Sequence, residues 1–178
     1  GMKEGAPSPT LATDIFPTIT VEPPAPEWAF LAGERLGWMR WYDTAAEGEY
    51  SHVGLRNPAG SGVLIVVKEI AVGFGATCNF HIGMRGNSAV DTQNPGYSRD
   101  SRLALQGMVG EVVTVTQVAA GIYPMWQGIV LNNVQYVFSQ PIVLHPCWEV
   151  LVHPSIQNTS VTGSFVWTER PIEQSETR

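Results

Sequence analysis

The stretch Cys147–His153, which reads CWEVLVH, decides the fold. Successive side chains of a β-strand point to opposite faces of the sheet. Trp148, Val150 and Val152 therefore share one face, and Glu149 lies on the other face with the remaining odd-numbered residues. This period of two, carried by β-branched and aromatic residues, predicts a strand rather than a helix.

The same β character recurs on both sides of this stretch. Val161–Thr168 places Phe165 and Trp167 on one face, and Glu111–Val118 is rich in β-branched residues. Further strands are expected at Tyr50–Leu55, Gly62–Val72, Thr77–Met84, Gly128–Phe138 (two short strands) and Pro141–Leu144. About eight short strands with turn residues between them predict an all-β fold, an antiparallel β-sandwich of the jelly-roll kind. Residues 85–102 are expected to form a polar loop.

The chain is poor in charge, and the shortage is uneven. Its 178 residues are 44% hydrophobic and only 15% charged, with a formal net charge of −6. A nucleic-acid partner is not expected, because nucleic-acid binders carry a basic surplus, and no apolar run is long enough for a membrane helix. Glu111 and Glu149 are the only charged side chains (Asp, Glu, Lys or Arg) between Leu103 and Thr168. Interface cores are depleted in charge, so we expect strands from residue 111 onward to carry subunit contacts, with the charges of 34–56 and 85–102 facing solvent.

Residues 1–30 differ from the rest, because they hold six of the thirteen prolines. Proline favours extended backbone at its own position and at the one before it. We expect an extended arm here, a β-sandwich domain over 31–171 and a charged tail over 172–178. The arm is either a free tail or a contact with a neighbouring subunit, to which it would offer its apolar residues Ile15, Phe16, Ile19 and Val21. No secretory signal follows Met2.

No motif in the sequence nominates catalytic chemistry. The four histidines, His52, His81, His145 and His153, include no His-x-His pair, so a cupin-like metal site is disfavoured. No nucleophile elbow and no phosphate-binding glycine loop is present. We expect no catalytic residue, no cofactor and no metal. Glu149 is unusual inside an apolar strand, and we expect it to form a structural ion pair with an arginine such as Arg56 or Arg102.

Six tryptophans in a small β-domain leave a sugar-binding alternative open. Trp126 lies in a connection, so we expect it to be the exposed tryptophan best able to stack on a ligand ring. Trp148 and Trp167 alternate with apolar residues and are expected in the core. Cys78 and Cys147 lack a CxxC spacing and are expected to be buried free thiols.

Three segments together resemble a known group of proteins. They are the turn and strand entry LRNPAGSGVL at 55–64, the PIVL segment at 141–144 with the WEVLV strand after it, and the closing FVWTERP at 165–171. Their order is similar to small jelly-roll structural proteins of tailed bacteriophages, of the capsid-decoration or fibre type, over about residues 34–171. The resemblance implies a non-enzymatic virion subunit, made in the host cytoplasm, that binds copies of itself and a major capsid or other virion protein. We expect a homotrimer, with dimers and larger rings as alternatives. The other reading is a carbohydrate- or receptor-binding module of a virion or secreted protein.

Overall fold

A computed structural model describes residues 35–100, 107–119, 123–130, 133–173 and 176. The expected arm at 1–30 and most of the expected tail lie outside this range, as does Arg102. The described residues form ten β-strands. Their bounds are β1 Arg35–Asp43, β2 Tyr50–Asn57, β3 Val63–Phe74, β4 Cys78–Gly86, β5 Thr92–Ser98, β6 Gly107–Gln117, β7 Tyr123–Val130, β8 Asn133–Leu144, β9 Trp148–Pro154 and β10 Val161–Pro171.

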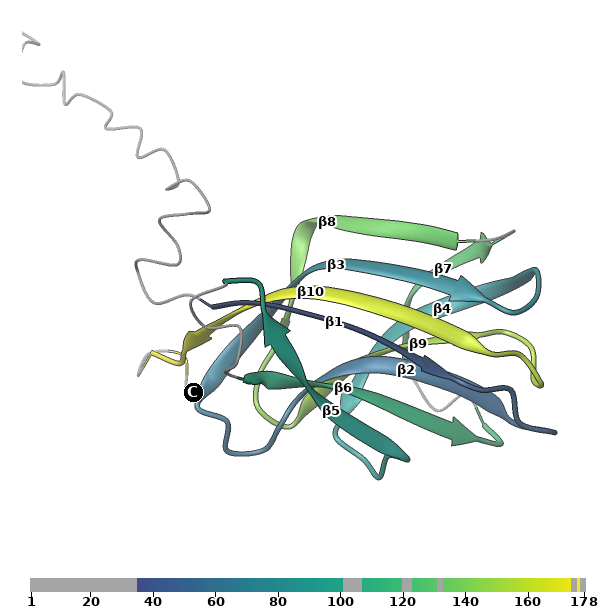
Figure 1. The fold of residues 1–178 in the computed structure, drawn as a ribbon, viewed down its shortest axis with the longest axis horizontal. Coiled ribbons are helices and arrows are strands. Elements are labelled where there is room, and N and C mark those ends of the chain that lie inside the picture. Colours follow the sequence, from purple (N-terminus) through teal and green to yellow (C-terminus); the bar gives the residue numbers. More distant parts are fainter. Residues whose placement is uncertain (1–34, 101–106, 120–122, 131–132, 174–175, 177–178) are drawn as a thin grey trace, which may run out of the picture.

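All ten strands belong to one curled antiparallel sheet with the order β7-β4-β9-β2-β6-β5-β1-β10-β3-β8 (Figure 1). If β5 and β6 are set aside, eight strands remain. The first of these strands pairs with the last, the second pairs with the second last, and the pairing continues inward in this way. β1 pairs β10, β2 pairs β9, β3 pairs β8, and β4 pairs β7. This nested pairing, rolled into two layers, is a jelly roll. The expected all-β, jelly-roll-like sandwich is therefore confirmed.

The strands β5 and β6 join the two layers into a single sheet. β6 pairs with β2 over seven residue pairs, and β5 pairs with β1 at Gly37↔Ser98 and Trp38↔Tyr97. The expectation of a loop over 85–102 is therefore wrong in part, because Thr92–Ser98 is a strand. Pro95 and Gly96 hid it, since both residue types are depleted in strands.

The core lies between the layers β8-β3-β10-β1 and β7-β4-β9-β2. Trp167 is its largest fully buried side chain, as expected. A Cβ on Gly37, Gly96 or Gly110 would come within 3 Å of the Trp167 ring. The indole of Trp167 therefore packs against the backbone of these three glycines, on β1, β5 and β6. We call this contact the glycine seat.

Two expectations about buried residues fail. Trp148 is 46% exposed, because it opens β9 opposite Gly86 and lies beyond the edge of the core. Cys78 is a buried free thiol as expected, but Cys147 is exposed, in a turn where its φ is 70°. Trp148 and Cys147 both lie at the strand end, where alternation no longer predicts burial.

Candidate functional site

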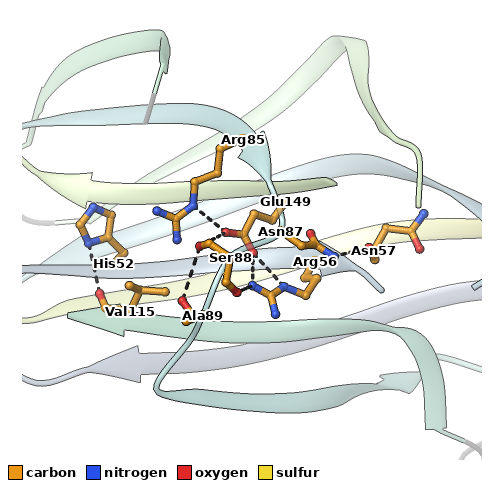
Figure 2. A network of polar contacts seen from close by, with 9 residues as sticks. All are labelled: His52, Arg56, Asn57, Arg85, Asn87, Ser88, Ala89, Val115 and Glu149. Atoms are coloured by element: carbon orange, nitrogen blue, oxygen red, sulfur yellow. Dashed lines mark hydrogen bonds and ion pairs between the residues drawn. The ribbon is translucent and has the colours of Figure 1, made fainter. Parts of the chain in front are cut away.

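Chemistry-bearing residues gather on the outer face of the layer β4-β9-β2, and they lie in cross-strand rows. In one row Arg85 is opposite Glu149, and Glu149 is opposite Arg56. Arg56 donates from Nε and Nη2 to Glu149 Oε2 at 2.8 and 2.6 Å, and Arg85 donates from Nε to Oε1 at 2.6 Å (Figure 2). The Glu149 carboxylate is fully buried and bridges the two guanidinium groups.

The segment between β4 and β5 closes over this row. Ser88 accepts a 2.6 Å hydrogen bond from Arg56 Nη2 at its carbonyl oxygen, and Asn87 Nδ2 donates to the Asn57 carbonyl at 3.0 Å (Figure 2). Both oxygens of Glu149 are thus occupied by arginines, which makes the cluster a structural clamp between strands. The expected Arg56–Glu149 pair is present.

The expectation that the charged side chains of 34–56 and 85–102 face solvent is wrong in part. Asp43 and Arg56 are buried. Asp43 accepts hydrogen bonds from the His52 backbone N–H and from the Thr116 hydroxyl. Burial is the main cause that raises the pKa of Asp43, and these hydrogen bonds oppose it.

A second row on the same face brings three histidines together. The rings of His52 and His81 lie 4.8 and 5.0 Å from that of His153, centroid to centroid. His153 Nδ1 is 2.7 Å from the Pro154 carbonyl, and burial lowers the pKa of His153 to about 4. His153 is therefore neutral at pH 7. His145 is exposed after β8 and does not join this row.

In the part of the chain that is described, no group of three or more His, Cys, Asp or Glu is arranged to hold a metal ion. The three rings of this row are in contact with one another around His153. Between this row and the arginine row, Leu151 lies over Gly54, where an added Cβ would be 2.3 Å from Leu151 Cδ2.

The outer face of the opposite layer has a different character. One row across β5, β1, β10 and β3 is Tyr97, Trp38, Val166 and Glu69. Trp38 is 45% exposed and Tyr97 is 54% exposed, and their ring centroids are 6.3 Å apart. Two large aromatic side chains therefore stand at the surface as one platform.

Apolar and small residues extend this platform along the face. The next row is Leu36, Thr168, Val66 and Val143, from β1, β10, β3 and β8. On the other side of Trp38, Arg40 is opposite Ser164, and Ser164 is opposite Ala71. We call the two rows, with Arg40, the aromatic face. Exposed and half-buried apolar side chains thus lie side by side across the neighbouring strands of this layer.

A shallow hollow of about 510 Å³ lies on the aromatic face, lined by Trp38, Glu69, Arg99 and Val166. A guanidinium and a carboxylate therefore border an exposed indole. Lys68, the extra residue of a β-bulge in β3, is exposed beside Glu69. The hollow offers ring stacking together with charged hydrogen-bonding groups.

The residues nominated from the sequence are placed as follows. Trp126 does not lie in a connection as expected but in β7, with its backbone opposite Ile82, and its side chain is outside the described part. Ile15, Phe16, Ile19 and Val21, the four expected arm contacts, are also outside it. The structure adds Trp38 and Tyr97, which sequence reasoning missed. Arg40 shares a strand face with Trp38 at a spacing of two, but Asp43 lies on the other face of the same strand, so charge did not identify the outer face.

Comparisons with known proteins add no family: no family model, curated protein or solved structure matches the chain. Within the described ranges, no helix has the length and apolar character to cross a membrane.

Proposed function

We propose that this chain is a non-enzymatic structural subunit that assembles with copies of itself through the aromatic face. The observation that carries the proposal is the exposed row Tyr97, Trp38 and Val166, which leaves two large rings half in water. Interfaces are enriched in aromatic residues and depleted in charged ones at their centres. On the outer face of the layer β4-β9-β2, both carboxylate oxygens of Glu149 are already bonded to arginines, which supports a structural role for that face.

The virion role rests on the sequence resemblance. Small jelly-roll structural proteins of tailed bacteriophages use the same kind of fold, and fold by itself does not imply function. On this proposal the protein is a capsid-decoration or fibre-type subunit located in the virion, a homotrimer bound to a capsid or tail lattice.

A matched pair of tryptophan variants tests the role of the aromatic face. Trp38 and Trp148 are exposed to nearly the same extent, 45% and 46%, but lie on different strands and away from one another in the register. Light scattering coupled to size exclusion should show that Trp38→Ala lowers the mass of the assembly, whereas Trp148→Ala leaves it unchanged. Equal behaviour of the two variants would contradict the proposal.

Carbohydrate or receptor binding is the second candidate, and the hollow beside Trp38 favours it. An indole flanked by Glu69 and Arg99 can stack on a sugar ring and bind its hydroxyl groups. Titration of the full chain with a glycan panel, followed by tryptophan fluorescence, tests this candidate. Quenching that disappears in Trp38→Ala supports it, and an unchanged spectrum with every glycan removes it.

A further inference from the structure

Cations outnumber carboxylates on the aromatic face, where Glu69 is the one acidic side chain of the two rows, although the chain as a whole has a net charge of −6. Among the described residues, the exposed Lys and Arg side chains are Arg40, Lys68 and Arg99. Arg40 follows Trp38 on the same strand face, Lys68 lies in the β3 bulge, and Arg99 lines the hollow. All three therefore border the same apolar surface.

This charge argues against two aromatic faces packed directly on one another. A symmetric contact would bring Arg40, Lys68 and Arg99 of both copies into one interface, where Glu69 is the one carboxylate that the two rows supply. Like charges brought together in an interface cost several kcal/mol. The occupant of the face should instead be acidic and apolar.

The N-terminal segment of the chain has this chemistry. Residues 1–34 contain Glu4, Asp14, Glu22, Glu27 and Glu34 against the single cation Lys3, a net charge of −4. Between Asp14 and Glu22 lie the apolar residues Ile15, Phe16, Ile19 and Val21. A stretch of apolar residues bounded by carboxylates is complementary to an aromatic surface bordered by cations.

The reach of the chain and the proposed self-assembly together favour a neighbouring copy over the same copy. Pro23, Pro24 and Pro26 follow Val21 and Glu22, and proline-rich chain is extended and semi-rigid. Fully extended, the chain from Val21 to Arg35 reaches about 45 Å. Residues 14–22 can therefore reach well beyond their own β1, and an arm bound to its own copy would not supply the contact between copies that the proposed self-assembly needs.

We propose that residues 14–27 of one copy bind across the aromatic face of a neighbouring copy, with Glu22 and Glu27 near Arg99 and Lys68. This inference rests on the proposed self-assembly and adds the segment that makes the contact. It assigns the arm to its subunit-binding alternative.

Lys68 makes a direct test available, because Lys3 and Lys68 are the two lysines of the chain. Light and ¹⁵N-labelled full chains are equilibrated together and treated with a carbodiimide, which joins a lysine amine to a carboxylate. The expected product joins Lys68 to Glu22 or Glu27, with one peptide light and the other heavy. If every crosslink between Lys68 and the arm joins two peptides of the same isotope, the inference is overturned. The absence of any such crosslink would also overturn it.

Charge reversal provides the second measurement. Arg99→Glu with Lys68→Glu, and separately Glu22→Lys with Glu27→Lys, should each raise the concentration at half assembly at least about tenfold. The two changes together should restore assembly, while Glu47→Lys, at an exposed acid between β1 and β2, should have no effect. Failure of the combined variant to recover overturns the inference. If neither charge reversal changes the assembly, the arm contact is overturned and the proposed self-assembly is not. If the wild type is a monomer, the arm contact and the proposed self-assembly are both overturned.

Discussion

Trp167 donates a 3.0 Å hydrogen bond from its indole Nε1 to Glu169 Oε1, two residues further along β10, and both side chains are buried. The same carboxylate accepts the backbone N–H groups of Gly110 and Val109, at 2.6 and 3.1 Å. β10 and β6 are not neighbours in the sheet. The hydrogen bonds to Glu169 thus connect β6 to β10, in the layer that carries the aromatic face.

Replacing Glu169 with Gln should destabilise the protein. One carboxylate oxygen becomes an NH₂ group that faces a backbone or indole N–H, so a buried donor loses its acceptor. The expected loss in the free energy of unfolding is about 1–3 kcal/mol. Urea unfolding monitored by Trp fluorescence measures it, and a midpoint equal to that of the wild type would refute the role given to Glu169.

The glycine seat of Trp167 gives a second prediction. A Cβ at Gly96 would lie 2.2 Å from Trp167 Cη2, whereas a Cβ at Gly107 would meet Pro95 Cβ at an ordinary 3.7 Å. Gly96→Ala should therefore lower the free energy of unfolding by about 1–3 kcal/mol, the usual cost of overpacking a core. Gly107→Ala is the matched control in the adjacent strand. Equal unfolding midpoints for the two variants would argue against the seat.

The clamp around Glu149 should depend more on Arg56 than on Arg85, because Arg56 makes two of the three short hydrogen bonds. Removing one partner of a buried ion pair costs about 3–5 kcal/mol. Arg56→Met should approach that cost, and Arg85→Met should cost less. Chemical denaturation of the two variants ranks them, and the reverse order would contradict this account.

Stability should fall in mild acid because of His153. In the unfolded chain a histidine titrates near 6.5, whereas burial lowers the pKa of His153 to about 4 in the fold. Above pH 6.5 both states are neutral and the fold has its full stability. As the pH falls from 6.5 to 4 the unfolded state alone takes up the proton, so the free energy of unfolding drops by about 3 kcal/mol.

Urea midpoints at a series of pH values measure this loss, with His153→Gln as the control. Asp43 works in the opposite direction, because its raised pKa favours the fold as acid is added. Subtracting the profile of His153→Gln isolates the contribution of His153. A variant that keeps the full acid sensitivity of the wild type would show that His153 is not the source.

The jelly roll was accessible from the sequence because alternation is a local property. Cys147–His153 predicts its two faces correctly from Glu149 to His153, and a carboxylate inside such a strand predicts a cationic partner, which Arg56 supplies. Arg85 could not be found in this way, since its place beside Glu149 depends on β4 and β9 being neighbours.

The aromatic face was missed for a related reason. β1 alternates, but both of its faces carry aromatic residues, so the pattern does not say which face is inside. The answer depends on Gly37, which must face inward to seat Trp167 and thereby turns Trp38 outward. That constraint comes from a residue far away in the sequence.

The molar mass of the full-length chain in solution, followed by light scattering over a wide concentration range, tests the central claim most directly. Assembly through the aromatic face predicts a multiple of 19.4 kDa, with a trimer favoured. A mass of 19.4 kDa at every concentration, with no association as the protein is concentrated, would contradict it.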